Sequence, residues 1–362
     1  TEEMFFPNAE VTINPALLVL LGLIVGALGG FFGVGGGFLI TGGLLVFGVP
    51  PLFAVGTGLA LVMGSSLINT LKHLHLGNVD FKLGFFMLLG SVPALFAAER
   101  VNRELEAADL AGPVIRYLYV ILLAGLGFFI LWDHWRTHRR GVTAREESTT
   151  EGLSQRLQAW DIPPRYISLP GLRKFSTVTS LPMSRIPRIS VFIPVSIGLG
   201  VGFFAGILGA GGAFILTPIL IYVLGVPTLV AIGTGLFQVV VTGSAGTFVY
   251  ALSDRVDPMM AVLMLVAASI GAQVGASATK FVEASRIRFL YGVIVLVGGA
   301  AVALEEVSEA SGVDVLSTLA SLVLLGVGGG MCLWLGVLLL KAKRSGGSPE
   351  GQGQQHFDSG RR

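Results

Sequence analysis

The sequence predicts an all-α polytopic membrane protein built from two inverted-topology repeats with glycine-broken helices. Apolar residues make up 53% of the 362 residues and charged residues only 13%, about half the charged share of a soluble domain. A glycine-rich stretch occurs twice within apolar sequence, at 33–41 and at 209–217. The sequence around the second copy repeats the sequence around the first, which indicates an internal duplication.

The apolar runs follow one another along the chain, and most are long enough to cross a hydrocarbon core of about 30 Å. In the first half they are 16–32, a short piece that ends at Phe47, 52–74, 83–98 and 114–132. In the second half they are 191–208, 212–224, 229–251, 259–279 and 287–304, and the run at 315–340 has no counterpart. We therefore expect about 9–11 membrane segments. Whether each glycine-broken pair crosses fully or forms a re-entrant hairpin stays open.

These runs divide the chain into six parts. We expect an N-terminal extracytoplasmic segment (1–15), membrane repeat 1 (16–135), a basic cytoplasmic linker (136–189), membrane repeat 2 (190–304), an extra C-terminal transmembrane helix (305–344) and a disordered tail (345–362). The linker carries ten Lys or Arg against four acidic residues, is broken by prolines and includes a candidate short helix at 156–160. The acidic segment 99–109 is predicted to be a loop.

The duplication holds residue by residue. Gly22, Gly26 and Gly30 match Gly198, Gly202 and Gly206, and Phe38 and Thr41 match Phe214 and Thr217, all at an offset of 176. After one inserted residue, Gly48-Val49-Pro50 matches Gly225-Val226-Pro227 and Asp80 matches Asp257. Each half has an odd number of crossings, so the halves have opposite topology, which is typical of transporters with a site between the repeats.

The distribution of Lys and Arg predicts the orientation. Basic residues gather in the linker, at 280–288 and at 341–344, whereas acidic residues gather near the N-terminus, at 99–109 and at 305–314. The sequence therefore predicts a multi-pass protein of the cell membrane, an inner membrane where there are two, with its N-terminus outside and its C-terminus in the cytoplasm.

Several classes of function lack support in the sequence. Cys332 is the single cysteine, and no Cys/His cluster indicates a metal site. We find no nucleophile–base pair and no cofactor motif, so we expect neither an enzyme nor a cofactor. The basic loops are explained by membrane topology, so no nucleic-acid partner is expected. The expected partners are the lipid bilayer and a small anionic substrate, and the oligomeric state stays open.

The glycine-rich stretches are the first candidates for the substrate site. Clustered glycines are poor helix formers, so each stretch predicts a broken helix. A helix that restarts after a break offers free backbone N–H groups and a positive end, both of which suit an anion. The candidate residues are Gly33, Gly35, Gly36, Gly37, Gly209, Gly211 and Gly212. The alternative is a purely structural turn, whereas the glycines spaced by four upstream are expected to pack helices closely.

Uncharged polar residues in the third span of each half are the second candidates. They are Thr57, Asn69, Thr234, Gln238 and Thr242. Hydroxyl and amide donors can bind an oxyanion without placing a charge in the bilayer, and the last three share one helix face. The alternative is that these side chains bond their own helix carbonyls or hold helices together. No span has a charge clearly at its centre, and Asp80 and Asp257 are predicted to be helix N-caps.

The paired glycine motifs resemble those of the TauE/SafE sulfite exporter family. The Gly-Val-Pro turns, the segments Val55–Gly58 and Ile232–Gly235 and the loop Gly77–Asp80 fit the same family. The resemblance covers roughly residues 5–135 and 190–304, and it implies a permease for sulfite, sulfonates such as sulfoacetate, or related sulfur compounds. The first half departs from the pattern at Gly42, where the family has proline and the second copy keeps Pro218. Leu61 also stands opposite Gln238, so a symmetric site and a site nearer the second half both stay open.

The sequence thus predicts a secondary carrier that moves a small anion, a sulfur oxyanion or organosulfonate such as sulfite or sulfoacetate, by alternating access between inverted repeats. An anion channel on the same scaffold and a structural or sensory membrane protein stay open as alternatives. The anion itself, the direction of transport and the coupling ion are not fixed by these patterns.

Overall fold

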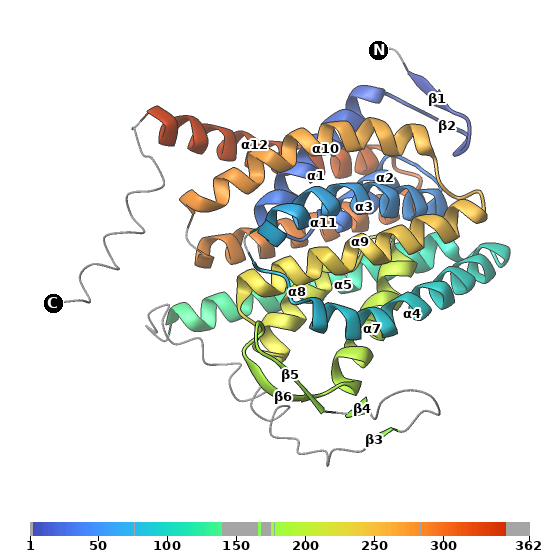
Figure 1. The fold of residues 1–362 in the computed structure, drawn as a ribbon. Coiled ribbons are helices and arrows are strands. Elements are labelled where there is room, and N and C mark those ends of the chain that lie inside the picture. Colours follow the sequence, from blue (N-terminus) through green and yellow to red (C-terminus); the bar gives the residue numbers. More distant parts are fainter. Residues whose placement is uncertain are drawn as a thin grey trace.

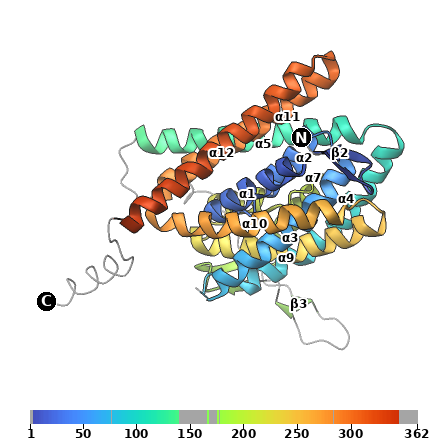
Figure 2. The ribbon, with the colours of Figure 1, turned by 90° about the horizontal axis from the view of Figure 1, so that it is seen from above.

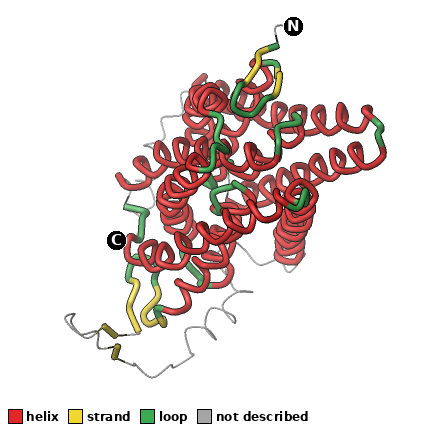
Figure 3. Tube along the Cα trace, turned by 90° about the vertical axis from the view of Figure 1, so that its right-hand side faces the viewer, coloured by secondary structure: helices red, strands yellow, loops and turns green. Residues whose placement is uncertain are grey.

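The computed structural model describes residues 3–75, 77–139, 166–167, 175–176, 178–282 and 284–344. Helices dominate the described chain and run across the view of Figure 1, with the connection between α4 and α5 at the right. The strands lie at the periphery of this bundle (Figure 3). The predicted all-α polytopic fold is confirmed.

The order of helices repeats from one half to the other. The first half contains α1 (Pro15–Phe32), α2 (Gly37–Val46), α3 (Pro51–His75), α4 (Phe81–Ala107) and α5 (Ala111–Arg139). The second half contains α7 (Phe192–Leu208), α8 (Ala213–Pro218), a π-helical turn η1 (Ile219–Val223), α9 (Thr228–Leu252), α10 (Pro258–Ala278), a 3-10 turn η2 (Thr279–Phe281) and α11 (Ala284–Ser311). The additional helix α12 (Asp314–Arg344) follows and lies across the outside of the bundle, against α11 and α1 (Figure 2).

Three small antiparallel hairpins were not predicted. They pair β1 (Met4–Phe6) with β2 (Val11–Ile13), β3 (Tyr166–Ile167) with β4 (Phe175–Ser176), and β5 (Val178–Leu181) with β6 (Ile186–Ser190). The last hairpin lies within the predicted linker and buries Leu181, Ile186 and Ile189 against helical residues. These apolar residues are too few and too scattered to form a recognisable run. The predicted helix at 156–160 and the predicted disordered tail lie outside the described residues.

The acidic segment 99–109, which was predicted to be a loop, is largely helical, so this prediction was wrong. Helix α4 continues through 99–107 and α11 through 305–311. The charged residues end the apolar runs of the sequence, but the helices continue beyond these runs, because the carboxylates form ion pairs with arginines there. Glu99 pairs with Arg103 one turn later at 2.9 Å, and Glu306 pairs with Arg116 of α5 at 3.3 Å.

Eight described helices are long and apolar enough to cross a membrane, namely α1, α3, α4, α5, α9, α10, α11 and α12. Three shorter apolar segments remain, formed by α2, by α7 and by α8 with η1. Large apolar side chains project outward from several spans, and Ile121, Phe128 and Leu333 are each more than two-thirds exposed. Such a surface is stable only against lipid, so the chain is a multi-pass membrane protein.

Glycines let two helix pairs approach closely. A Cβ atom at Gly22 or Gly26 would overlap backbone atoms of Met264 or Ala268, so α1 lies directly against α10. The equivalent glycines of α7, Gly198 and Gly202, meet Met87 and Ser91 of α4 in the same way. The predicted close packing is therefore confirmed. It is also reciprocal, because the contacted residues of α4 and α10 are equivalent in the two repeats: Met87 and Met264 are 177 residues apart, as are Ser91 and Ala268.

We expect Gly26→Val to destabilise the protein strongly. The added side chain meets the Ala268 backbone, which cannot move aside without separating α1 from α10, and overpacking of this kind costs about 1–3 kcal/mol or more. The measurement is thermal unfolding in detergent, followed by fluorescence-detected size exclusion. The matched control is Gly330→Val in α12, where a Cβ meets nothing within 4 Å. Equal midpoints for the two variants would contradict the packing argument.

Candidate functional site

Both glycine-rich stretches break a helix, as predicted. Helix α1 ends at Gly33 and α2 begins after Gly36, with φ angles of 69° and 71° at these glycines. Helix α7 ends at Gly209 and α8 begins after Gly212, with φ angles of 69° and 81°. A residue with a side chain rarely adopts this left-handed backbone conformation, so glycine is required at these positions.

Each break turns the chain back on itself. In the first half Gly36 packs against Val25 and Gly43 against Leu21, so α2 runs back alongside α1. In the second half Gly212 packs against Val201 and Ala205 of α7. Since α2 has ten residues and a helix rises 1.5 Å per residue, its length is about 15 Å, roughly half the thickness of the hydrocarbon core.

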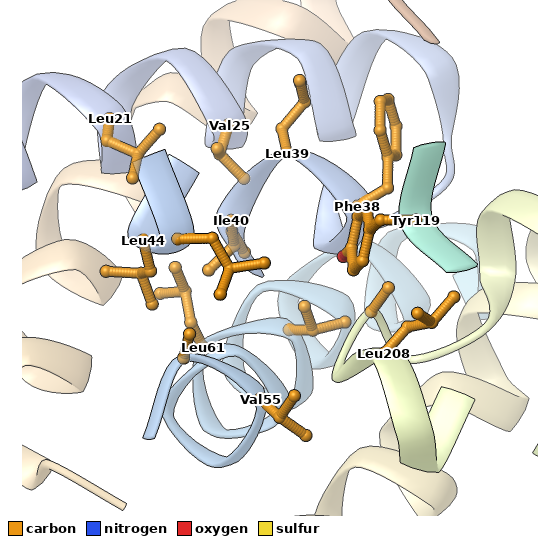
Figure 4. Close-up of a cluster of buried hydrophobic side chains, with 14 of the residues drawn as sticks. Leu21, Val25, Phe38, Leu39, Ile40, Leu44, Val55, Leu61, Tyr119 and Leu208 are labelled. Carbon is orange, nitrogen blue, oxygen red and sulfur yellow. The ribbon is translucent and has the colours of Figure 1, made fainter. Parts of the chain in front are cut away.

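The two breaks meet in the interior of the molecule. A Cβ at Gly37 would overlap the carbonyl oxygen of Ala210, so the two turns touch through their backbones. The equivalent phenylalanines Phe38 and Phe214 pack ring against ring at 5.7 Å, and Tyr291 joins them. Figure 4 shows this region, with Ile40 and Leu44 of α2 directed toward Leu61 of α3, and Leu39 directed to the opposite side.

Equivalent threonines after the two breaks differ in their contacts. In the first half Thr41 Oγ1 donates a hydrogen bond to the carbonyl of Gly209 at 3.1 Å. The equivalent bond in the second half would join Thr217 to Gly33. Thr217 Oγ1 is instead buried without a hydrogen-bond partner among the described residues. Both Thr217 and Gly33 line a cavity. The cavity therefore reaches the position at which the equivalent threonine and glycine, Thr41 and Gly209, are joined by a hydrogen bond.

This cavity has a volume of about 720 Å³. Its wall includes the end of α1, the side of α3 at Asn69, the α8–η1 segment and the start of α11. It lies toward the end of the bundle where Asn78, Thr279 and Arg288 gather, which we call the cavity end. Most of the wall is apolar, contributed by aliphatic and aromatic side chains such as Phe32, Ile221, Ile232 and Tyr291.

Most polar groups of the wall already have partners. Asn69 Nδ2 donates to the Ser65 carbonyl at 3.0 Å, the Tyr291 hydroxyl to the Phe214 carbonyl at 3.0 Å, and Thr279 Oγ1 to the Ala276 carbonyl at 2.8 Å. Thr217 keeps a free hydroxyl and Arg288 contributes a cation. The sequence analysis missed Arg288, because it assigned 280–288 to a cytoplasmic turn. Among the described residues no group of three His, Cys, Asp or Glu side chains is placed to hold a metal ion.

Of the predicted site residues, Gly33 and Asn69 line the cavity and the other ten do not. Thr57 Oγ1 accepts a hydrogen bond from the N–H of Asp257 at 3.0 Å, and Thr234 Oγ1 accepts one from the N–H of Asp80 at 3.0 Å. Both aspartates are N-caps, of α10 and α4, as predicted. The two threonines therefore hold the helix starts of the opposite half in place.

The remaining predicted residues are buried in the centre. Gln238 is 1% exposed and its Oε1 has no hydrogen-bond partner among the described residues, whereas Thr242 Oγ1 donates to the Gln238 carbonyl at 3.0 Å. Leu61, opposite Gln238 in the repeat, lies in the apolar cluster beneath α2 (Figure 4). The carbonyl of Gly35 accepts a bond from Ser65 Oγ at 3.3 Å, and Gly211 lies between Val62 and Val239.

Ion pairs join the helices at the opposite end of the bundle. This acidic end contains Glu106, Asp109, Glu306 and Glu309 around a hollow of about 460 Å³. Arg116 of α5 pairs with Glu306 at 3.3 Å and also with Glu309, and Arg255 pairs with Glu106 at 2.8 Å. These pairs connect α5 to α11 and the α9–α10 loop to α4 at the end away from the larger cavity.

Comparison with known proteins agrees with this architecture. The model of the family Sulfite exporter TauE/SafE matches residues 18–302, which include both glycine breaks. The chain belongs to the TauE/SafE family. It is therefore a membrane transporter of that family, and its partners are the bilayer and a small substrate.

The relatives of this TauE/SafE protein are named as probable membrane transporter proteins. "Probable membrane transporter protein YunE" of Bacillus subtilis is 23% identical over 291 residues, which cover 78% of this chain and 95% of the relative. "Probable membrane transporter protein YjnA" of the same species is 24% identical over 282 residues, 78% and 97% of the two chains. A "Probable membrane transporter protein" of Xylella fastidiosa is 35% identical over 108 residues, 29% of this chain and 41% of the relative. No solved structure matches the chain significantly.

We expect Thr57→Val and Thr234→Val to lower the stability of the protein by similar amounts. Each change keeps the shape of the side chain but leaves the buried N–H of Asp257 or Asp80 without its acceptor, which costs about 1–3 kcal/mol. Thermal unfolding in detergent measures the effect. Thr57→Ser and Thr234→Ser keep the hydroxyl and serve as controls. An unchanged midpoint in either valine variant would mean that its hydrogen bond does not hold the helix start.

Proposed function

We propose that this TauE/SafE protein is a secondary carrier for a small anion, a sulfur oxyanion or organosulfonate such as sulfite or sulfoacetate. It moves the anion across the cell membrane by alternating access between two inverted repeats. The observation that carries this proposal is that two contacts, which are equivalent in the two repeats, differ in the structure. Thr41 is bonded to Gly209, whereas Thr217 and Gly33 both face the cavity.

A duplicated carrier that changes access would exchange these two contacts. In the described conformation the Thr41–Gly209 contact is closed and ion pairs of Arg116 and Arg255 tie the acidic end. The cavity reaches the glycine break from the other end. In the opposite conformation Thr217 would bond to Gly33, and the Thr41–Gly209 contact would open toward the acidic end. One anion site near the breaks would then face each end in turn.

Reciprocal packing supports the inverted arrangement of repeats 16–135 and 190–304. Helix α1 packs on α10 and its equivalent α7 packs on α4, while α3 pairs with α9 and α5 with α11. Such exchange of partners is expected when a two-fold axis relates the halves. The segments that follow the two glycine breaks, α2 and α8 with η1, are too short to cross the hydrocarbon core. We therefore propose that α1 with α2, and α7 with α8, form re-entrant helical hairpins. The Lys and Arg bias then places the N-terminus outside and the cavity end in the cytoplasm.

Polar groups near the breaks would replace part of the anion's water. Asn69, Thr217 and the backbone at Gly33 lie on the cavity wall, and the first N–H groups of α2, at Gly37 and Phe38, have no acceptor in a preceding helical turn. In this proposal the other predicted residues lie along the path that the anion takes through the protein. The glycines of both breaks shape its centre, and the buried amide of Gln238 stands where the first half has Leu61.

We expect saturable uptake of at least one sulfur anion in proteoliposomes. Solid-supported-membrane currents would compare sulfite, thiosulfate, sulfate, sulfoacetate, taurine and chloride, and radiolabel counterflow would detect electroneutral exchange. Thr217→Val removes one donor to a charged group and should raise half-saturation roughly tenfold or more. The control is Thr247→Val, whose hydroxyl bonds the Gly243 carbonyl within α9. Conductance that does not saturate would favour the channel, and silence in both assays would contradict the proposed cargo.

We also expect the two equivalent threonine positions to differ in accessibility. In a Cys332→Ala background, Thr217→Cys should react with a small maleimide in detergent faster than Thr41→Cys, by on the order of tenfold. Thr217 lines the cavity, whereas Thr41 is fully buried and bonded to Gly209. Mass spectrometry over time gives both rates in micelles that expose both ends. Equal rates would contradict the unequal closure on which the alternating-access proposal rests.

A further inference from the structure

We propose that Asn102 and Tyr250 form the gate that closes the transport path at the acidic end, and that His73 and Thr279 form the equivalent gate at the cavity end. This inference rests on the proposed alternating-access function and names the side chains that control access to its site. The first gate is closed in the described conformation, and the second is open.

Asn102 of α4 and Tyr250 of α9 hold the end of α7 with a network of three hydrogen bonds. Asn102 Nδ2 donates to the Ile207 carbonyl at 3.1 Å and to the Tyr250 hydroxyl at 2.8 Å. The Tyr250 hydroxyl in turn donates to the Gly206 carbonyl at 3.0 Å. Helix α7 ends at Leu208, directly before the glycine break, so these bonds join three helices beside the break.

These bonds supply partners that helix α7 itself cannot provide. The last four carbonyls of an α-helix have no donor in a following turn, and a buried carbonyl without a donor is costly. Gly206 and Ile207 are buried, and so are both gate side chains, with exposed fractions of 0% for Asn102 and 1% for Tyr250. The gate therefore excludes water at this place. Water that enters an open path would replace its hydrogen bonds at small net cost.

The internal duplication places the same four positions at the other end of the molecule. Helices α3 and α9 correspond at an offset of 177 residues, as do α4 and α10, whereas α1 and α7 correspond at an offset of 176. The counterparts of Tyr250, Asn102, Gly206 and Ile207 are His73, Thr279, Gly30 and Phe31. All four counterparts line the larger cavity. The cavity therefore occupies the place that the closed gate fills at the acidic end.

The surroundings of the two glycine breaks show the same contrast. The atoms nearest to a Cβ built at Gly209 belong to the backbone of Val55 in α3, whereas those nearest to a Cβ at the equivalent Gly33 belong to the side chain of Ile232 in α9. Val55 is fully buried, whereas Ile232 lines the cavity. The break in the second half has thus closed directly onto α3, and the break in the first half leaves the cavity beside α9.

The residues of the open gate have the chemistry to close it. An imidazole N–H and a threonine hydroxyl are hydrogen-bond donors, as are a tyrosine hydroxyl and an asparagine amide. Gly30 and Phe31 lie in the last turn of α1, so their carbonyls need donors when the cavity closes. In the described conformation Thr279 Oγ1 donates to the Ala276 carbonyl, one turn earlier, at 2.8 Å. Closure would direct this hydroxyl to α1 instead.

The test measures how fast a small maleimide labels one cysteine at each end of the path. Val55→Cys reports on the acidic end and the equivalent Ile232→Cys on the cavity end, each in the full-length Cys332→Ala protein in detergent. Tyr250→Phe removes the hydroxyl that takes part in two of the three bonds. We expect it to raise the labelling rate of Val55→Cys roughly tenfold and to lower that of Ile232→Cys. The matched control is Thr247→Val, because that hydroxyl bonds a carbonyl within α9.

A second variant transfers the closed gate to the open end, and it removes no bond of the acidic-end gate. His73→Tyr combined with Thr279→Asn supplies at the cavity end the two side-chain types that close the acidic end. We expect this variant to slow the labelling of Ile232→Cys roughly tenfold and to speed that of Val55→Cys. Thermal unfolding of every variant in the same detergent checks that the changes in rate do not come from unfolding.

The outcomes separate the gate from the proposed function. Opposite changes at the two reporter cysteines, seen in both variants and absent in Thr247→Val, support both. Unchanged rates in folded variants would overturn the gate, while saturable anion uptake by the unchanged protein would keep the carrier. An effect of Tyr250→Phe alone would overturn the role of His73 and Thr279. A rise at the acidic end without a fall at the cavity end would keep the acidic-end gate and overturn alternating access, because both ends would then be open together.

Discussion

The structure depends on the contact between two interrupted helices. Within a hydrocarbon core, backbone that leaves a helix must be enclosed by protein or must line a cavity, because lipid supplies no hydrogen bonds. Both glycine breaks meet this constraint by folding against each other, with Gly37 on the Ala210 carbonyl and Phe38 on Phe214. Helices α3 and α11 pack on α2, and α9 packs on α8, so protein covers the segments that follow both breaks. The site therefore lies at the only kind of place in a bilayer where irregular backbone is tolerated.

The enclosure differs between the halves, and physical differences between the two copies account for it. In the first copy Gly42 allows α2 to continue as a regular ten-residue helix. In the second copy Pro218, which lacks an N–H donor, ends α8 after six residues. The chain then passes into a π-helical turn, in which the N–H of Leu224 reaches the Ile219 carbonyl at 3.2 Å. This wider turn brings Tyr222 to the cavity wall, on the side where Thr217 is left without a partner.

Much of the fold could be predicted from the sequence, because apolar length and glycine spacing report directly on bilayer crossing and helix contact. The bounds of α1, α3, α9 and α10 lie within one or two residues of the predicted spans. The ends of α4 and α11 extend beyond the apolar runs because of contacts with residues far along the chain, and the β5–β6 hairpin depends on such contacts too. A local sequence pattern does not reveal contacts of this kind. The site was harder to predict for the same reason. Thr57 and Thr234 looked like substrate ligands, but their bonds go to Asp257 and Asp80, more than 150 residues away.

The role of arginine in this protein illustrates why position in the fold matters more than net charge. Arg116, Arg255 and Arg288 all lie near helix ends, where a sequence offers only the rule that basic residues favour one side. The first two face carboxylates of other helices and are compensated as ion pairs. Arg288 lines a largely apolar cavity and interacts with the hydroxyl of Tyr222, which also interacts with Asp133. A cation in such surroundings attracts an anion more strongly than one in open water, because the low local dielectric weakens screening. The same surroundings penalise an anion that keeps its full hydration shell, because the apolar wall offers few hydrogen-bond donors.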